Sequence, residues 1–268
     1  MKIAVIGAGA MGGATVEGLI KGTFVNNNDI IVADPCKATL QRFADKGVVT
    51  TDDNAKAASA ADIVMVVVKP WLVETVLKGI RQSLDASRQT LIVIAAGVSS
   101  TNIREWVGDI PLFLAIPNIA IAEGASMTFL VEAEPQHTRK GGPQQDGQAA
   151  AGRLDVVKAL FDSMGETIVT DESHLSSGTA LASCGLAYAL RYIRAASEGG
   201  VQLGFKADDA TRIVAQTVKG AVSLLESSGK HPEQLIDQVT TPGGVTIKGL
   251  NAMEEAGFTN AVIKGLVK

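Results

Sequence analysis

Apolar and polar residues alternate along the first part of the chain in short blocks, which predict strands and helices in turn. Five apolar runs have the length and aliphatic content of buried strands: Ile3–Ile6, Ile30–Ala33, Ile63–Val68, Thr90–Ala95 and Leu112–Ile116. Helical patterns lie between them, for example over Lys37–Lys46 and Leu72–Leu84. Because strand and helix alternate, we expect an α/β Rossmann-like domain with a mostly parallel sheet and helices on both faces.

The pattern changes twice after the fifth run. Residues 134–152 are rich in Gly, Gln and Pro without an apolar period, which predicts a surface loop or disordered insertion. We expect that the segment Gln136–Gly152 can be shortened with little effect on activity. A helix over Leu154–Met164 and a strand over Thr167–Val169 complete the first domain, 1–170. From about Ser173 the pattern is helical, and the predicted helices are Leu175–Glu198, Ala207–Ser227, Pro232–Val239 and Val245–Glu255. We expect a second, all-α domain over 171–268.

These C-terminal helices are rich in small residues and poor in aromatic ones, which suits close helix packing. Their apolar faces exceed what one small bundle can bury, so a homo-oligomer is expected. The charge is mildly acidic, with 24 basic against 28 acidic residues, and no basic stripe suggests a nucleic-acid partner. No apolar run approaches the ~18 residues of a membrane span.

The cysteines and histidines predict neither a disulfide framework nor a metal site. The two cysteines, Cys36 and Cys184, and the absence of a signal-peptide pattern favour a cytoplasmic protein. The three histidines are isolated and lack ligand spacing, so we expect no metal. His231, directly before Pro232, is interpreted as the start of a helix.

A glycine-rich loop follows the first strand. Residues Gly7–Gly12 have the pattern G-x-G-x-x-G, and a helical pattern through Ile20 comes next, which is the context that dinucleotide binding requires. Gly7 permits the tight turn, Gly9 lets a pyrophosphate approach the backbone, and Gly12 lets helix and strand pack closely. The second strand ends at Asp34, near the ~20-residue offset expected for a ribose-binding acid.

The segment His231–Phe258 is the most informative part of the chain. A helix-like run leads into Thr240–Thr246, with the sequence TTPGGVT, and a second amphipathic run follows. Two consecutive glycines expose backbone N–H groups, which form an anion site at the start of a helix. With the hydroxyls of Thr241 and Thr246 beside them, they fit a small carboxylate with a polar ring atom. A Pro-Gly turn between two helices is the alternative.

With both ends considered, the chain resembles the pyrroline-5-carboxylate reductases over nearly its whole length. The shared motifs are Gly7–Gly12, Asn54, Val68–Pro70, Ala95–Gly97, Ile116–Asn118, Ala187-Tyr188, Ala215–Thr217, Gly220-Ala221, Thr241–Thr246, Gly249-Leu250, Glu254 and Gly257-Phe258. Thr241–Thr246 and its continuation are the most specific. The 6-phosphogluconate dehydrogenases share the first half of the chain but not this ending.

The resemblance implies hydride transfer from NAD(P)H to the C=N carbon of 1-pyrroline-5-carboxylate, giving proline. It also implies a C-terminal domain that interlocks with that of a second subunit, and in some members a decamer. A protonated cyclic imine needs no covalent catalyst, so the protein has only to position it, bind its carboxylate and hydrogen-bond its nitrogen. By family analogy Thr246 is catalytic, through its hydroxyl to the ring nitrogen. The substrate-binding residues implied are Thr241, Gly243, Gly244, Val245 and Glu172.

The expected cofactor contacts come from the strand ends, which should line one crevice, and from the resemblance. They are Ile6, Gly7, Ala8, Gly9, Ala10, Met11, Gly12, Asp34, Pro35, Asn54, Val68, Lys69, Pro70, Ala95, Ala96, Gly97 and Asn118. Asp34 favours NADH, because its charge would repel the 2′-phosphate of NADPH, although Lys37 and Arg42 could offset the repulsion. Alternatively, Lys69 is only a solvated cation, and Asn54 and the pair Asp171-Glu172 only cap the helices that follow.

The segment Ala182–Tyr188 departs from the Ser-Gly-Ser-Gly-Pro-Ala-Tyr usual in the family. Leu186 replaces a proline that would rigidify the bend, and Arg194 stands where an acid is common. We expect Cys184 to be a small buried residue rather than a reactive thiol. These departures leave two alternatives: a reductase of another small cyclic imine or 2-oxo acid, and a non-catalytic dinucleotide-binding relative.

Overall fold

The computed structural model describes residues 1–133 and 147–268. They form two compact units, Met1–Ser183 and Cys184–Lys268, whereas the sequence pattern placed the division at residues 170–171. Each unit is described by itself below.

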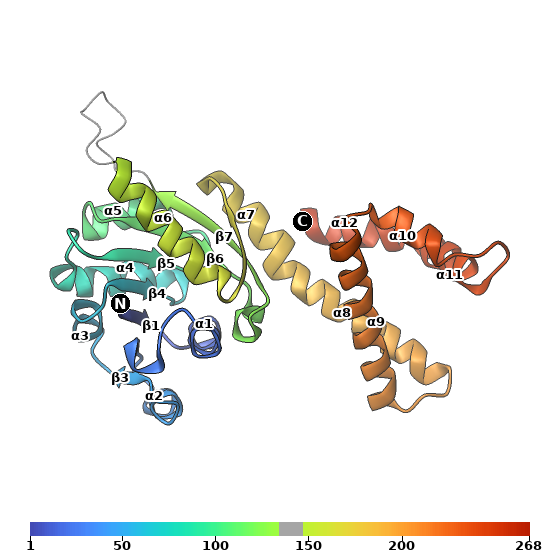
Figure 1. Ribbon diagram of the computed structural model, residues 1–268, viewed down its shortest axis with the longest axis horizontal. Helices are drawn as coiled ribbons and strands as arrows, with labels where there is room; N and C mark the ends of the chain where they lie inside the picture. The colour runs from blue at the N-terminus through green and yellow to red at the C-terminus, as the bar shows by residue number, and fades with distance from the viewer. Residues whose placement is uncertain (134–146) are drawn as a thin grey trace. The chain divides into compact units, whose positions relative to one another are not determined.

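The N-terminal unit is built on one sheet (Figure 1). Its strands are β1 (Ile3–Ile6), β2 (Ile30–Ala33), β3 (Val49–Thr51), β4 (Ile63–Val66), β5 (Thr90–Val93), β6 (Leu112–Ile116), β7 (Ser126–Ala133) and β8 (Gly165–Val169). Its α-helices are α1 (Ala10–Lys21), α2 (Lys37–Ala44), α3 (Asn54–Ser59), α4 (Pro70–Ile80), α5 (Ser100–Val107), α6 (Gly147–Asp162) and α7 (Leu175–Gly178). Short 3-10 turns are η1 (Asn27–Asp29), η2 (Arg81–Ser83), η3 (Ile119–Glu123) and η5 (Glu172–His174).

The strand order in this sheet is β3-β2-β1-β4-β5-β6-β7-β8, and all neighbouring pairs are parallel except β6 and β7. This confirms the predicted mostly parallel sheet. The chain crosses from β3 back to β4 on the other side of β1, so the order reverses between β1 and β4. Ligands of such sheets bind beyond the carboxyl ends of the strands at this reversal.

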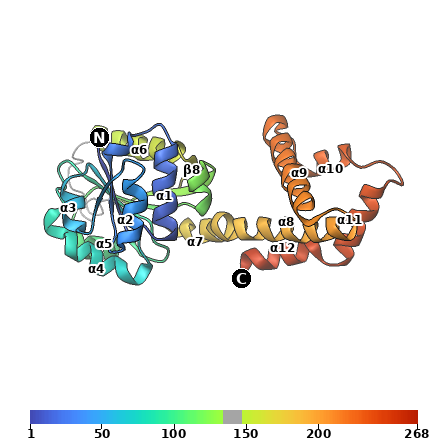
Figure 2. The ribbon, with the colours of Figure 1, turned by 90° about the horizontal axis from the view of Figure 1, so that it is seen from below.

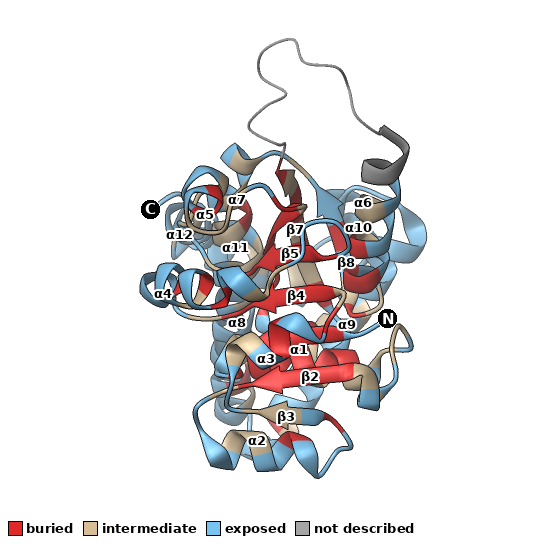
Figure 3. Cartoon of the chain, turned by 90° about the vertical axis from the view of Figure 1, so that its left-hand side faces the viewer, coloured by how far each residue is buried: buried red, intermediate tan, exposed pale blue. Residues whose placement is uncertain are grey.

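Helices cover both faces of the sheet, which explains why the strands are continuous aliphatic runs. One face packs against α1, α2 and α6, through Leu19, Phe43 and Phe161 among others. The other face packs against α3, α4 and α5, where Leu77 and Ile103 are fully buried. Figure 2 shows α6 and α4 on opposite sides of the sheet, and Figure 3 shows the strands buried beneath the exposed outer faces of these helices.

Two strands were missing from the sequence prediction. Strand β3 is only three residues long. Strand β7 contains Ser126 and Thr128, which give it no continuous apolar run, yet both are buried because the strand pairs with β6 and β8. Pairing in the folded sheet, rather than local composition, decides that this segment is a strand.

The insertion predicted over 134–152 lies largely outside the described residues. Where the description resumes, the chain is already helical, because α6 begins at Gly147. The prediction of a loop was therefore wrong for 147–152. Three consecutive alanines in this stretch have the highest helix propensity of any residue, and they extend the helix toward its N-terminus.

The C-terminal unit consists of helices. They are α8 (Gly185–Gln202), α9 (Ala207–Ser228), α10 (Pro232–Gln238), α11 (Val245–Glu255) and α12 (Phe258–Val267). Helices α8 and α9 approach closely, since a Cβ on Gly200 would lie 2.9 Å from the Cβ of Ala210. The Tyr188 hydroxyl donates to the Gly265 carbonyl (3.0 Å) and ties α8 to α12. His231 caps α10 through its ring nitrogen, which confirms its predicted place at a helix start.

A π-helical turn, η6 (Thr179–Cys184), separates α7 from α8, so the helix predicted over Leu175–Glu198 is interrupted. Turns of this kind are often found at functional sites. Cys184 is the last residue of the turn and is exposed, so the prediction of a buried thiol was wrong. Cys184 is also the first residue of the C-terminal unit, which has almost no core of its own.

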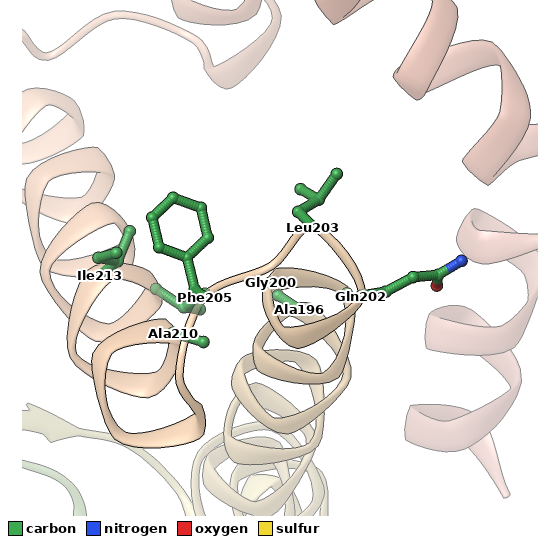
Figure 4. A pocket seen from close by; sticks show the side chains of 9 residues that line it. Ala196, Gly200, Gln202, Leu203, Phe205, Ala210 and Ile213 are labelled. Carbon is green, nitrogen blue, oxygen red and sulfur yellow. The ribbon is translucent and has the colours of Figure 1, made fainter.

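That lack of a core is the main property of the C-terminal unit. Ser197 and Ala210 are the buried residues among the described residues 184–268, and most of the large exposed apolar side chains of the described chain belong to this range. An apolar groove of about 660 Å³ lies where α8 ends and α9 begins. Figure 4 shows Leu203 and Phe205 at its rim above Ala196, Gly200 and Ala210. Within the described ranges, no helix combines the length and apolarity that crossing a membrane requires.

Candidate active site

The glycine loop between β1 and α1 has the geometry of a dinucleotide-binding turn. Gly7 has φ +92°, and a Cβ there would lie 2.5 Å from the Val67 carbonyl oxygen. A Cβ on Gly12 would lie 1.9 Å from the Gly7 carbonyl oxygen. A Cβ on Gly9 would meet nothing within 4 Å. Gly7 and Gly12 are thus needed for the turn and its packing, whereas Gly9 faces open space that a phosphate can approach.

The first turn of α1 supplies the donors for that phosphate. Gly9 is the N-cap of α1, and no side chain caps it. The first N–H groups of a helix have no acceptor within the helix, and the helix dipole there favours an anion. Ala10, Met11 and Gly12 therefore present backbone N–H groups toward the open side of Gly9.

Asp34 lies at the end of β2 beside this loop. One carboxylate oxygen accepts the Ala8 N–H (2.8 Å) and the other accepts the Cys36 N–H (2.8 Å). The carboxylate is therefore held against the glycine loop in a fixed orientation, with lone pairs left for a further donor. Cys36 is exposed, and hydrogen bonds from Thr39 and Ala38, that of the Thr39 side chain first, lower the pKa of its thiol.

The residues after β3 and β4 continue the carboxyl edge of the sheet, with β4 next to β1 and β3 beyond β2. Asn54 is the first residue of α3, and Asp53 caps that helix by accepting the N–H groups of Ala55 and Lys56. The alternative that Asn54 is the cap was therefore wrong. Lys69 is exposed at the N-cap of α4, with Pro70 as the first helical residue. A Cβ on Gly7 would lie 2.5 Å from Val68, so Val68 borders the loop.

The end of β5 leads through an open turn into α5. Ala95 is half-buried, and Ala96 and Gly97 are exposed. Gly97 has φ +77°, which favours glycine, and a Cβ there would meet nothing within 4 Å. Its turn leaves backbone exposed at the carboxyl edge of the sheet, where a ligand is expected.

Asn118, after β6, is 7% exposed and has protein partners for both polar atoms of its side chain. Its Oδ1 accepts the Ala120 N–H (3.0 Å), and its Nδ2 donates to the Ala182 carbonyl (3.3 Å). Direct contact between this side chain and the cofactor stays a prediction. The structure gives Asn118 a second role, which is to attach η3 and the π-helical turn to the end of β6.

Glu172 also has a role that the sequence did not reveal. Its two carboxylate oxygens accept the N–H (2.9 Å) and the hydroxyl (2.6 Å) of Ser100, the first residue of α5. Its neighbour Asp171 accepts the Ser173 N–H (2.9 Å) and so caps η5. The capping alternative for Asp171-Glu172 is thus confirmed for Asp171, while Glu172 reaches an element 72 residues away in sequence. No periodic signal around Ser100 could have indicated this contact.

The motif Thr240–Thr246 forms the connection from α10 to α11. Gly243 has φ +71°, and the Gly244 N–H donates to the Thr241 carbonyl (3.0 Å). A Cβ on Gly244 would lie 2.4 Å from Thr241 Oγ1 and 3.1 Å from the Thr241 carbonyl oxygen, so a larger residue there would displace the Thr241 side chain. Gly244 is the N-cap of α11, without a side-chain cap. The free N–H groups for an anion therefore start with Val245 and Thr246, since that of Gly244 is used by the turn.

Thr246 is half-buried on the first turn of α11. Among the residues that the structure describes, its hydroxyl has no hydrogen-bond partner, whereas the hydroxyl of Thr240 donates to the Ile236 carbonyl (2.7 Å). The Thr246 hydroxyl is therefore available to a ligand next to unpaired backbone N–H groups. No cluster of three or more metal-binding side chains occurs within residues 1–133 and 147–268.

Comparisons with known proteins agree with both halves of this description. Residues 172–268 match the family model described as pyrroline-5-carboxylate reductase dimerisation, and residues 2–97 match the model described as NADP oxidoreductase coenzyme F420-dependent. Pyrroline-5-carboxylate reductase 2 of Dictyostelium discoideum is 36% identical over 99% of this chain and 90% of its own length. The chain belongs to the pyrroline-5-carboxylate reductase family.

Two further members of this family extend the comparison. Pyrroline-5-carboxylate reductase 1 of Dictyostelium discoideum is 39% identical over 99% of this chain, and the chain spans 48% of the length of that relative. The crystal structure of Plasmodium falciparum pyrroline carboxylate reductase with NADP bound has a TM-score of 0.83 and 24% identity. It covers 99% of this chain and 94% of its own, which supports the fold assigned here.

The departures from the family pattern now have a structural setting. Leu186 stands in the first turn of α8, directly after the π-helical turn. The Ser183 hydroxyl donates to the Pro117 carbonyl (3.3 Å) after β6. Arg194 forms an exposed ion pair with Glu198 (2.9 Å) on α8, which contributes little to stability. Ser183 stands where the family usually has glycine, so this hydroxyl contact is one that a glycine could not make.

Proposed function

We propose that the protein reduces 1-pyrroline-5-carboxylate to L-proline with NADH or NADPH. The observation that carries the proposal is the start of α11, where unpaired backbone N–H groups stand beside the unpartnered hydroxyl of Thr246. That combination suits a carboxylate and a ring nitrogen on one small molecule. Membership of the family supports the same substrate.

The shape of the glycine loop fits the cofactor. The space beside Gly9 is open to a ligand, whereas the space beside Gly12 is filled by the backbone of Gly7. The backbone N–H groups of Ala10, Met11 and Gly12 would hold its pyrophosphate, and Asp34 its adenosine ribose. When bound, NAD(P)H supplies the hydride.

The substrate groups are assigned to α11 and the turn before it. The N–H groups of Val245 and Thr246 bind the carboxylate, and Gly243, Gly244 and Thr241 shape the turn that presents them. The Thr246 hydroxyl hydrogen-bonds the ring nitrogen and holds the imine in one orientation. We assign Glu172 differently, because both of its carboxylate oxygens bind Ser100.

The assay that tests this function measures oxidation of NADH and NADPH by the full chain with 1-pyrroline-5-carboxylate, other cyclic imines and small 2-oxo acids. Turnover with 1-pyrroline-5-carboxylate is expected. Thr246→Val should lower kcat by roughly tenfold or more, since loss of a hydrogen bond that leaves its partner unsatisfied costs about 1–3 kcal/mol. Cofactor binding should not change. Turnover by another compound alone would select the alternative reductase, and cofactor binding without any turnover would select the non-catalytic relative.

For the cofactor we propose that NADH is used at least as well as NADPH. The fixed carboxylate of Asp34 supports this, because it accepts hydrogen bonds from ribose hydroxyls and repels a 2′-phosphate. The Arg42 guanidinium lies 4.4 Å from the ring centroid of Phe43. This cation–π contact would compete with a 2′-phosphate for the guanidinium. Asp34→Ser should shift the ratio of kcat/KM toward NADPH. A strong NADPH preference in the unaltered protein would refute the assignment.

For the assembly we propose a homodimer through the C-terminal helices, which in some family members builds a decamer. The scarcity of buried residues after Cys184 and the apolar groove between α8 and α9 support a second copy as the partner. We propose a cytoplasmic location, supported by two cysteines that form no disulfide.

A further inference from the structure

Residues 172–183 hold the carboxyl ends of β5 and β6. Glu172 accepts both the N–H and the hydroxyl of Ser100, which closely follows the β5 turn at Ala95–Gly97. The π-helical turn binds the end of β6 through two hydrogen bonds, Asn118 to Ala182 and Ser183 to Pro117. These contacts all lie within the N-terminal unit.

The strand order assigns these two ends to one half of the crevice. Asp34, directly after β2, marks the adenosine side, and the pyrophosphate belongs to the glycine loop after β1. A dinucleotide bound across the reversal must place its other half beyond β4, toward β5 and β6. The turn at Ala95–Gly97 therefore faces the nicotinamide half and not the adenosine half.

The contact between Glu172 and Ser100 is the strongest of the three. A carboxylate that accepts two hydrogen bonds forms charge-assisted bonds, which are about twice as strong as neutral ones. Its charge also lies at the N-terminus of α5, where an anion is stabilised by the helix dipole. Ala95 and Val98 on either side of the turn pack against the apolar core. Gly97 between them has φ +77°, and a Cβ added to it would meet nothing within 4 Å, so no side chain holds the middle of the turn.

We propose that Glu172 is a positioning residue for the nicotinamide half of the cofactor, acting through Ser100 and the turn at Ala95–Gly97. The proposal rests on the proposed function only in requiring a nicotinamide dinucleotide. A glutamine at position 172 can still accept from the Ser100 N–H and donate to its hydroxyl. It should therefore keep most of the positioning, whereas an alanine removes it.

The test compares two ligands by calorimetry on the full chain. One is the oxidised form of the preferred cofactor, and the other is the matching fragment without the nicotinamide ring, ADP-ribose or its 2′-phosphate. Glu172→Ala should lower the affinity for the dinucleotide by about tenfold, which is the order of effect that loss of a charged hydrogen bond produces. The affinity for the fragment should stay within about twofold of that of the unaltered protein. Glu172→Gln should lie near the unaltered protein. Glu105→Ala is the matched control, because Glu105 is an exposed carboxylate on the same helix α5 but far from its N-terminus, and it should change neither affinity.

Kinetics separate positioning from contact with the substrate. With 1-pyrroline-5-carboxylate, Glu172→Ala should lower kcat and leave the KM of the imine unchanged. Ser100→Ala should also lower kcat, to a smaller degree. It replaces Glu172→Ala in the test if that variant does not fold. Equal weakening of both cofactor ligands, unchanged binding of both, or a raised KM of the imine with unchanged cofactor binding would each overturn the proposal. The binding measurements stand even if the protein does not reduce the imine.

Discussion

The N-terminal unit buries most of its large apolar side chains inside itself, and the C-terminal unit leaves most of its own on the surface. In the first unit, helices on both faces of one sheet enclose two apolar clusters. In the second, Ser197 and Ala210 are the buried residues among those described. Both units form well-defined helices, so the difference lies in packing rather than in local propensity. The first unit can be stable by itself, and the second requires another surface.

Expressing the two units as separate chains should give the largest difference in thermal stability between them. Residues 1–183 alone are expected to melt cooperatively, because their core is complete. Residues 184–268 alone should show helical circular dichroism without a cooperative melt as a monomer, because exposed apolar helices gain no packing energy. Thermal melts with light scattering measure both. A cooperative melt of monomeric 184–268 would contradict the comparison.

Substitutions in the glycine loop should separate folding from binding within the N-terminal unit. Gly12→Ala places a Cβ 1.9 Å from the Gly7 carbonyl oxygen, so it should cost about 1–3 kcal/mol of stability, as overpacking does. Gly9→Ala meets nothing within 4 Å, so the melting temperature should hold while cofactor affinity falls.

The matched pair distinguishes a structural glycine from a ligand-facing one. Thermal melts and cofactor titration of both variants are the measurements. Loss of stability in Gly9→Ala, or retention of it in Gly12→Ala, would show that the loop geometry differs from the one described.

A charge on the apolar groove should weaken the assembly. Leu203 is 82% exposed, and full burial of such a side chain stabilises by about 1.5–3 kcal/mol. Leu203→Asp should therefore reduce the mass measured by light scattering at micromolar concentration. Trp71→Ser, which changes a residue 75% exposed in the N-terminal unit, is the control and should leave the mass unchanged. An unchanged mass in Leu203→Asp would remove the groove from the interface.

The smallest expected effect concerns a charge near the core of the first unit. Burial raises the pKa of Glu132 on β7, against a smaller lowering effect of Arg153. An acid with a raised pKa in the folded state destabilises the fold once the pH rises through its ordinary and raised values. Glu132→Gln should slightly raise the melting temperature at about pH 7, and the gain should vanish at about pH 3.5, below the ordinary glutamate pKa of about 4.3. A gain that persists at the acidic pH would exclude ionisation as its cause.

The sequence by itself determined the aliphatic strands of the sheet, the glycine loop and the Thr240–Thr246 turn, but not β3 or β7. Continuous aliphatic runs reveal buried parallel strands. Helices cover both faces of such a sheet, so its strands do not alternate between apolar and polar residues. Gly7 and Gly12 were predictable because only glycine fits their conformation or contact. His231 was predictable for a local reason, since helix starts depend on a few adjacent residues.

Contacts between distant segments were decided only by the tertiary structure. Strand β7 is buried by its neighbours despite Ser126 and Thr128, and Glu172 meets Ser100 72 residues away. Cys184, expected to be buried from its type, is exposed because the unit it begins has little core to cover it. Burial and pairing depend on what the rest of the chain places opposite a residue, and a local pattern of apolar and polar positions contains no record of that.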